Sequence, residues 1–380
     1  MKKKNFPETA MLRPRGRWSS LRFSGHSLPG KYSRIAAVSL SALLLALSAC
    51  GAQGGSGTSK ADLTAKLAFN ADGTPDLKGM TFSIGNAAGS AHTGDTNVYD
   101  LVQFLKKWGA KATQTNASQN APELAVASGQ LDAAAGPLPT EVDSGLNVFG
   151  PNQARLDDLV LAKKSVATLA DMKGKNVAIC CNASPDGVLL AAVLKQAGLN
   201  QSQISVLRTG ASSASLSALI AGKVDAAFVH SDGVPKAGPN YHVLAVGGSI
   251  LPQYADSFMA ATPSWLKSHP AMAEAIDLAW LASAKLFNTN EAQWVQNAAA
   301  YTSHADTTAK YEQTWQELRS IQGWPVSGSV MTPAVVNFNL RIAAQQNSLK
   351  GQGNRPAAQE MDLTPWQQAW AAFSAHEGAY

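Results

Sequence analysis

The sequence contains few cysteines and few charged residues for its length. Only three cysteines occur among 380 residues, which excludes a disulfide-rich secreted scaffold. The seven histidines are scattered, and no cysteine or histidine pair has zinc-ligand spacing, so we expect no metal site. No G-x-S-x-G, H-E-x-x-H or GxxxxGK[ST] motif occurs. We therefore expect a protein that is not an enzyme and has no cofactor.

A basic surface for nucleic acid is also lacking, although the formal net charge is +5. Residues 1–49 hold nine basic residues and one acid, and the rest of the chain has a net charge of −3. No basic patch with interleaved aromatic residues occurs after residue 50. The positive balance belongs to the N-terminal segment, and we expect no nucleic-acid partner.

That N-terminal segment has the organisation of a secretory signal. A basic region ends at Arg34, and the apolar run Ile35–Leu47 is too short to span a membrane. Leu47-Ser48-Ala49-Cys50 is similar to a bacterial lipobox, which would make Cys50 the lipid-modified first residue of the mature protein. An ordinary signal peptide with a chance cysteine is the alternative. The Gly/Ser-rich stretch 51–60 is typical of a flexible tether.

The stretch from Lys173 to Asp232 has the pattern of parallel βαβ units. Short apolar runs at Val177–Ile179, Ile204–Leu207 and Ala226–Val229 alternate with helix-like segments. Each run ends in a small polar loop, and such loops line the crevice beyond the carboxyl ends of parallel strands, where ligands bind. The pattern predicts a half-domain that holds a small molecule.

A similar unit occurs earlier in the chain. Gly129–Ala134 reads GQLDAA and Gly222–Ala227 reads GKVDAA, each after an expected helix and before a polar loop. The glycine suits a helix C-cap, the aspartate holds the turn, and the alanines allow close helix packing. Two such lobes facing each other predict a cleft. The residues after about 263 have mostly helical spacing, and we expect their tryptophans to lie in the core.

Several motifs, in this order, resemble the substrate-binding proteins of bacterial ABC importers for nitrate, sulfonates, taurine and thiamine precursors. They are ADMKGKNVA at 170–178, Asn182–Pro185, KQAGL at 195–199, AGKVDAA at 221–227 and PSWLKSHP at 263–270. The similarity extends over Gly79 to Tyr380. The chain departs from the family at Cys180-Cys181, and its loop Asn86–Asp95 lacks the aromatic residues of many relatives.

The resemblance implies an α/β periplasmic-binding-protein type II fold, with two lobes joined by a two-segment hinge and a helical C-terminal region. The expected organisation is a signal peptide (1–49), a lipidated cysteine and linker (50–76), lobe 1 (77–162), lobe 2 (163–255) and a return to lobe 1 (256–380). The implied function is capture of a small polar, anionic solute such as a sulfonate, nitrate or taurine. The implied partners are an ABC permease and ATPase, with a monomer anchored to the membrane and facing the periplasm or the cell exterior.

Candidate ligand contacts share a place at or just after an expected strand: Asn86, Ser184, Arg208, Ser212, Ser213, His230 and Asp232. The hydroxyls precede helices, so they can cap the helix or attract an anion to its N-terminus. Arg208 can pair with an acidic ligand group or lie on the surface. The others are either cleft residues or solvated loop residues.

Three further alternatives remain open in the sequence. Thiamine-pyrimidine binding or synthase chemistry on the same fold would give a role to Cys180 and Cys181. A sensory lipoprotein could use the fold without a transporter. The two cysteines themselves either close a strained disulfide ring or are small buried thiols at a strand end, and we expect the second.

Overall fold

The computed structural model describes residues 66–87, 95–117, 120–182, 184–350 and 356–380. The expected signal peptide, the lipid attachment at Cys50, most of the linker and most of the loop Asn86–Asp95 lie outside these residues. Among the described helices, none combines the length and the apolar character that crossing a membrane requires.

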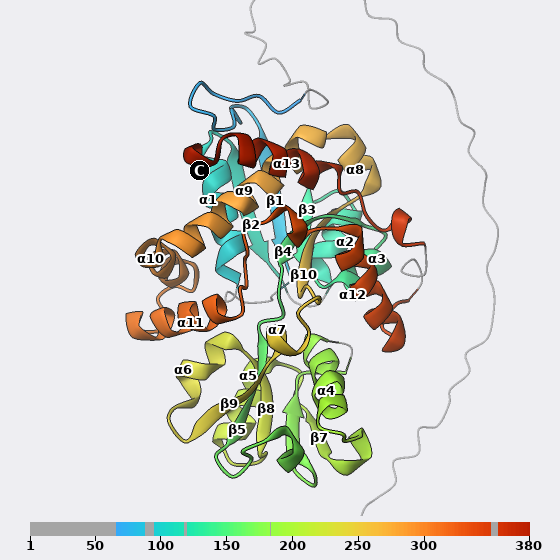
Figure 1. Cartoon of the computed structure of the whole chain (residues 1–380). Helices are drawn as coiled ribbons and strands as arrows, with labels where there is room; N and C mark the ends of the chain where they lie inside the picture. Colours follow the sequence, from blue (N-terminus) through green and yellow to red (C-terminus); the bar gives the residue numbers. More distant parts are fainter. Residues whose placement is uncertain (1–65, 88–94, 118–119, 183, 351–355) are drawn as a thin grey trace, which may run out of the picture. The chain divides into compact units, whose positions relative to one another are not determined.

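Two five-stranded mixed sheets form the centres of two lobes (Figure 1). The strands of the first sheet, in spatial order, are β2 (Lys111–Asn116), β1 (Thr81–Asn86), β3 (Ala133–Gly136), β10 (Ser257–Ala261) and β4 (Asn147–Gln153). Those of the second sheet are β7 (Ser205–Arg208), β6 (Asn176–Ile179), β8 (Ala226–His230), β5 (Asp158–Lys163) and β9 (Tyr241–Val246). This is the α/β arrangement predicted from the sequence.

Both sheets follow one plan. The first three strands of each sheet are parallel, and the fourth, β10 or β5, runs antiparallel to its neighbours. Each of these antiparallel strands follows a chain segment that passes from one sheet to the other. The expected boundary at residue 162 grouped β5 with lobe 1, whereas its apolar run pairs with β8 and β9 of the second sheet. The passage from lobe 1 to lobe 2 therefore falls between Gln153 and Asp158.

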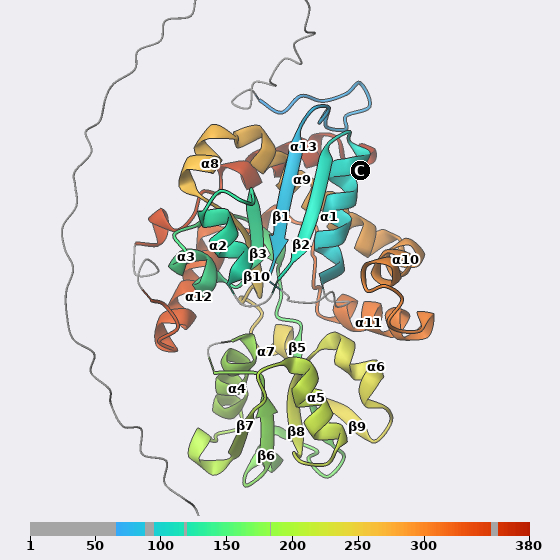
Figure 2. The ribbon, with the colours of Figure 1, turned by 180° about the vertical axis from the view of Figure 1, so that it is seen from behind.

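The helices surround the two sheets. Those before the second crossing are α1 (Thr96–Lys107), α2 (Ala121–Ala127), α3 (Leu138–Asp143), α4 (Pro185–Gln196), α5 (Ser212–Ile220), η4 (Ser231–Gly233), α6 (Val234–Ala237) and α7 (Gly247–Ile250). Those after it are α8 (Pro263–Ser268), α9 (Pro270–Thr289), α10 (Glu291–Tyr301), α11 (Thr308–Ser320), α12 (Pro333–Gln345) and α13 (Thr364–Ala375). Figure 2 shows α2 beside β3 and the C-terminal helices around the first sheet.

The repeated G-x-x-D-A-A motif has the same role in both lobes. Gly129 and Gly222 have positive φ angles of 76° and 72° just after a helix, where glycine has no Cβ penalty. Asp132 accepts hydrogen bonds from the backbone and hydroxyl of Ser83 in β1. Asp225 accepts one from the backbone of Asn176, the first residue of β6. In each lobe the aspartate therefore ties the start of the third strand in spatial order, β3 or β8, to the second strand, β1 or β6.

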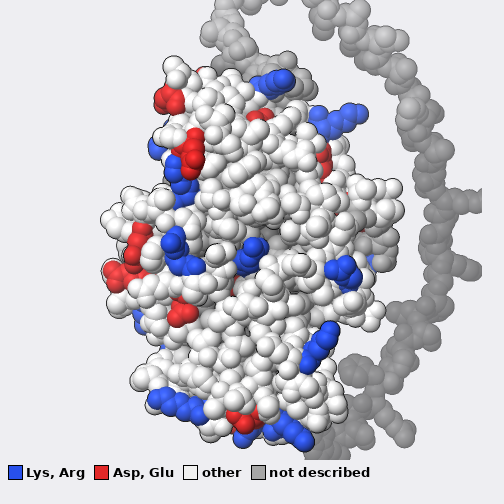
Figure 3. All heavy atoms as spheres, in the orientation of Figure 1, with Lys and Arg blue, Asp and Glu red and all other residues white. Residues whose placement is uncertain are grey.

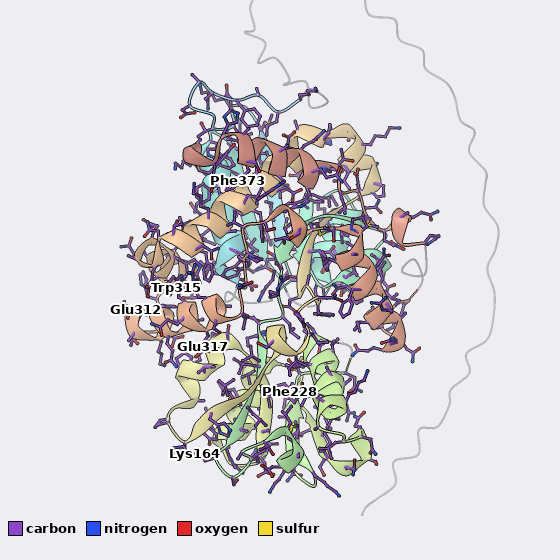
Figure 4. The ribbon with its side chains drawn as sticks, in the orientation of Figure 1. Lys164, Phe228, Glu312, Trp315, Glu317 and Phe373 are labelled. Atoms are coloured by element: carbon purple, nitrogen blue, oxygen red, sulfur yellow. The ribbon has the colours of Figure 1, made fainter. Side chains whose placement is uncertain are left out.

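The core of lobe 1 joins its sheet to the C-terminal helices. Alanine-rich α9 packs against α1 and α13, and small side chains allow this close approach. Trp280, Trp294, Trp324 and Trp366 are fully buried there, as expected for core tryptophans. In Figure 4, Phe373 lies on α13, while Phe228 lies in the interior of lobe 2, whose sheet has an apolar cluster on each face.

Candidate functional site

Buried acidic groups and one histidine gather where the chain passes between the lobes. Asp157 and Asp158 lie at the start of β5, and His230 ends β8. The antiparallel register places Asp158 directly opposite His230. The His230 Nδ1 atom lies 3.0 Å from the Asp157 Oδ1 atom and 3.4 Å from the Asp158 Oδ1 atom. We call Asp157, Asp158, Asp186, Asp256 and His230 the acid–His cluster.

The cluster draws on both crossings. Asp256 precedes β10 on the return crossing, and its backbone N–H donates to the Gln153 carbonyl on the outward crossing over 2.9 Å. Asp186 comes from the first turn of α4 and accepts a 2.6 Å hydrogen bond from the Cys180 backbone. Ser231 donates from its hydroxyl to Asp157 over 3.3 Å. A change in the crossings would therefore alter the cluster.

Burial sets the protonation of these groups. Asp158 is fully buried, and this burial, together with repulsion from Asp186, raises its pKa well above the usual range. Burial and the charge of Asp157 raise the pKa of Asp256 to about 8. Desolvation opposes the charged form of His230, but attraction to Asp158 and Asp157 outweighs it and raises the His230 pKa. Asp158 and Asp256 therefore hold their protons to higher pH than exposed carboxyl groups do.

The atoms of Asp157, Asp158 and His230 also satisfy the spacing of a metal site, since one ligand atom from each lies within 4.8 Å of the others. Two carboxylates and an imidazole are a donor set that divalent transition metals accept. No metal site was expected from the sequence, because no cysteine or histidine pair has ligand spacing along the chain. These three residues come together only through the pairing of β5 with β8.

A second polar group lies in lobe 1 at the ends of β1 and β2. The Tyr301 hydroxyl accepts from the amides of Asn86 and Gln114 over 3.3 Å each and donates to Asn116 over 3.3 Å. Asn86 is buried, and its register partner on β2 is Asn116. Asn86 therefore contributes a hydrogen-bonding side chain at the strand end. We call Asn86, Gln114, Asn116 and Tyr301 the amide–Tyr group.

The predicted hydroxyl contacts are engaged within the protein. Ser184 is the N-cap of α4: its Oγ accepts from the Gly187 backbone over 3.4 Å and donates to the Cys181 carbonyl over 2.8 Å. Ser212 and Ser213 were expected to precede their helix, but α5 begins at Ser212. The Ser212 hydroxyl lies in the first turn of α5. It accepts a 3.0 Å hydrogen bond from the backbone N–H of His230.

The remaining predicted residues lie apart from the acid–His cluster or bind other side chains. Arg208 is exposed on β7 and donates to Asn182 over 3.0 Å. Asp232 pairs with Lys236 over 2.6 Å. Of the predicted set, the structure thus brings His230 and Ser212 together, and it places Ser184 and Arg208 at one turn around Asn182. Asn86 belongs to the other lobe.

The acidic members of the cluster were not among the residues predicted from the sequence. In particular, the two adjacent aspartates at 157 and 158 were not among the candidate ligand contacts. A signal was present, since paired carboxylates directly before a fully apolar run are costly to bury without a purpose. Tyr301 carried no such signal, because it lies far along the chain in α10.

Two surface hollows lie outside the cluster. One, of about 400 Å³, is lined by β9 and α6 residues and by Gln313 of α11. The other, of about 530 Å³, is lined mainly by α4 residues and by Gln346. Neither includes a carboxylate or His230, so the chemistry favours the acid–His cluster over either hollow. On the face in Figure 3, Lys and Arg side chains are scattered and form no basic patch over the described residues.

Comparisons with known proteins identify the fold. Residues 153–290 match the NMT1/THI5-like family model, a span from the first crossing to the end of α9. The ligand-binding component of an ABC-type import system from Staphylococcus aureus, solved with zinc bound, has a TM-score of 0.60 at 15% identity, over 76% of this chain and 99% of that one. No curated protein sequence matches the chain.

Two further solved structures share the fold. The putative periplasmic sulfonate-binding protein SsuA from Methylobacillus flagellatus has a TM-score of 0.60 at 14% identity, over 80% of this chain and 96% of that one. The desulfurization enzyme DszB has a TM-score of 0.54 at 11% identity, over 77% and 99% of the two chains. These findings confirm the two-lobed fold and the resemblance predicted from the motifs, and they show that the fold serves binding proteins and an enzyme.

Proposed function

From the two-lobed fold and the NMT1/THI5-like match, we propose that this chain is the solute-binding component of an ABC-type importer. It captures a small polar solute between its lobes and delivers it to a membrane permease and its ATPase. The two crossings give the lobes a hinge, and ligand contacts made by both lobes favour the closed state. Export and lipid attachment at Cys50 would keep the monomeric protein at the outer face of the cell membrane.

The observation that carries this proposal is the acid–His cluster. Its members come from both crossings and from lobe 2, so a solute bound there would feel the relative position of the lobes. Asp158 is fully buried, and its carboxyl group lies 3.4 Å from the His230 Nδ1 atom and interacts with Asp186. Burying several acidic groups together is costly, and a site is where a protein retains them.

The charges refine the solute class. A simple anion would meet the Asp157 carboxylate, and Asp186 already occupies the first turn of α4, where the helix dipole would attract an anion. A zwitterion such as taurine suits the site better, because its ammonium group can pair with these carboxylates. Its sulfonate can then accept hydrogen bonds from neutral donors such as the amides of the amide–Tyr group.

The test compares taurine with ethanesulfonate, which has the same sulfonate and lacks the ammonium group. Isothermal titration calorimetry on the full chain should give tight binding for taurine and at least tenfold weaker binding for ethanesulfonate. Thermal stabilisation should follow, at about 2.7 kcal/mol for a hundredfold excess over the dissociation constant. Equal binding of both compounds would rule out the zwitterion, and flat responses to both and to nitrate would remove the solute-binding proposal.

DszB shares the fold and is an enzyme, so catalysis on this scaffold is the competing function. Cys180 and Cys181 are the residues that would serve it. Incubating the full chain with taurine or with an aryl sulfinate and measuring released sulfite separates the two functions. Binding without sulfite release supports transport, whereas steady release supports an enzyme.

A further inference from the structure

Cys180 and Cys181 form a close thiol pair at the end of β6. Their Sγ atoms lie 2.9 Å apart, and the Cys181 side chain is exposed while Cys180 is partly buried. Two buried thiols were expected from the sequence, and the exposed side chain of Cys181 corrects that expectation. The sulfurs need to move less than about 1 Å to reach the length of a disulfide bond, about 2.05 Å.

The surrounding turn holds both residues in place. The Cys180 backbone N–H donates to Asp186, and its carbonyl accepts from Gly210 over 2.9 Å. The Cys181 carbonyl accepts from the Ser184 hydroxyl over 2.8 Å. The start of α4 and the loop after β7 thus hold this segment at the end of β6, so the approach of the two sulfurs is a property of the fold and not of a free loop.

The two thiols differ in their chemistry. A hydrogen bond from Cys180 lowers the pKa of Cys181 to about 6, against an opposing effect of burial. The same bond, with burial and the charge of Asp186, raises the pKa of Cys180. The thiolate is the reactive form of cysteine, so Cys181 is the nucleophile and Cys180 holds its proton in reserve.

We propose that Cys180 and Cys181 are a thiol-modification site, at which the exposed Cys181 sulfur attacks a disulfide substrate and Cys180 then closes the pair into an internal disulfide. In the first step the Cys181 thiolate forms a mixed disulfide with one half of the substrate and releases the other half as a thiolate. In the second step the Cys180 sulfur loses its proton to solvent, attacks Cys181 and releases the second half. The pair loses two electrons, and the substrate disulfide gains them.

The internal disulfide should be easily reduced, because Cys180 and Cys181 are neighbours in the chain. Neighbouring Cα atoms are about 3.8 Å apart, which is shorter than the usual separation across a disulfide, so the ring is strained. Strained or exposed disulfides are the readily reduced ones. A dithiol such as dithiothreitol should therefore restore the pair. Formation of the disulfide also removes the thiolate charge beside Asp186. Asp186 belongs to the acid–His cluster and accepts a hydrogen bond from the Cys180 backbone, so it links the two sites.

The expected rate advantage depends on pH. At pH 5.5 about a quarter of a thiol of pKa about 6 is ionised, against about one part in a thousand for an ordinary cysteine of pKa about 8.5. The less basic thiolate is intrinsically slower by roughly tenfold. Cys181 should therefore react about 20-fold faster than an ordinary thiol at pH 5.5 and only about threefold faster at pH 7.

The test uses glutathione disulfide as the probe and intact-mass spectrometry as the readout, on the full chain with Cys50→Ser so that only the pair remains. The parent should lose the mass of two hydrogens and carry no glutathione. Cys180→Ser, which keeps a hydroxyl donor, should stop at a stable adduct of one glutathione. Cys181→Ser should react at least tenfold more slowly at pH 5.5, because burial and Asp186 still raise the Cys180 pKa.

Other outcomes overturn the proposal. A parent that accumulates a stable glutathione adduct shows that Cys180 does not close the pair, and a parent that stays fully reduced shows that the site does not react. Equal rates for the two single variants contradict the assignment of Cys181 as nucleophile. Cys180→Ala tests the hydrogen bond between the two thiols. Without this donor, the pH at which Cys181 is alkylated at half its maximal rate should rise, whereas Cys180→Ser should leave that pH near 6.

Discussion

The His230 Nδ1 atom lies 3.0 Å from a carboxylate oxygen of Asp157, an almost fully buried side chain on the outward crossing. His230 belongs to lobe 2, so this contact joins the last residue of β8 to the segment on which the lobe turns. The neighbouring Asp158 and the hydroxyl of Ser231 extend the contact on either side. A solute or ion that pairs with Asp157 must compete with this imidazole.

The first prediction concerns Asp157→Asn. The substitution keeps the shape and removes the negative charge, so it should weaken taurine binding at least tenfold, about 1.4 kcal/mol. Glu312→Gln is the matched control, because Glu312 is an exposed acid on α11 (Figure 4) and should leave binding unchanged. Calorimetry on both variants measures the effect. If Asp157→Asn binds taurine like the parent, the cluster is not the solute site.

The second prediction concerns stability against pH. Glu123 and Glu141 are fully buried in lobe 1, and a Cβ on Gly136 would touch the carboxylates of both. Burial raises the pKa of Glu123 to about 7, and burial with the Glu123 charge raises the pKa of Glu141 well above its usual range. Raised folded-state pKa values favour the protonated fold. This stability is complete below about pH 4.5 and is lost as pH rises through 7.

Urea unfolding at pH 5.5, 7.0 and 8.5 measures that loss. The free energy of unfolding should fall with pH, by up to about 1.4 kcal/mol per pH unit for each proton released. Glu141→Gln should flatten the curve, since glutamine fits a buried neutral site and cannot ionise. Glu312→Gln should keep the parent slope. A parent curve that rises between pH 5.5 and 8.5 would show that the pair is ionised in the fold.

Much of the fold was predictable because its signals are local. The apolar runs at 177–179, 204–207 and 226–229 and the repeated G-x-x-D-A-A motif each correspond to elements of the structure. Local caps were also predictable, as at Ser184. Asp95, in contrast, occupies the N-cap position of α1, but its side chain makes no capping hydrogen bond to the helix. The sequence can predict the position of a cap, but it does not predict the rotamer of the capping side chain.

The candidate site was predictable only in part, because it depends on long-range pairing. His230 could be chosen as a residue after a strand, but its partners Asp157 and Asp158 are set by the register of β5 with β8, some seventy residues apart. Asp256 joins through the return crossing. No local pattern predicts that carboxylates from two crossings converge. The anionic solute class was implied by the family resemblance, and the proposal of a zwitterion rests on acidic side chains that only the fold brings together.

The third prediction concerns an ion pair between the lobes. Lys236 of α6 lies 3.6 Å from Asp306, which precedes α11, and α11 packs against α6 and η4. Lys236→Ala removes this tie and should enlarge the radius of gyration of the unliganded protein in small-angle scattering. Lys310→Ala is the control. Lys310 also pairs with Asp306, at 3.2 Å, but it lies four residues further along the same segment, so this pair does not join the two lobes.

Salt separates the two variants further. Partly exposed ion pairs contribute up to about 1 kcal/mol and are screened by salt. In 0.5 M NaCl the radius of gyration of the parent should therefore approach that of Lys236→Ala. An equal expansion with Lys310→Ala would mean that Asp306 acts on its own helix and not between the lobes. An unchanged radius in both variants would mean that this pair does not hold the lobes.

The fourth prediction concerns Gly247 at the start of α7. A Cβ there would lie 2.4 Å from the Asp158 carbonyl oxygen and 2.8 Å from the Leu156 side chain, and a backbone carbonyl cannot move aside cheaply. Gly247→Ala should therefore displace the first residues of β5 and with them the acid–His cluster. We expect a loss of about 1–3 kcal/mol in the free energy of unfolding, the usual cost of overpacking, together with weaker taurine binding. Gly378→Ala is the control, because nothing lies within 4 Å of its Cβ position. Denaturant unfolding and calorimetry on the two variants test the contact, and a Gly247→Ala protein as stable as Gly378→Ala would show that the crossing has room to move.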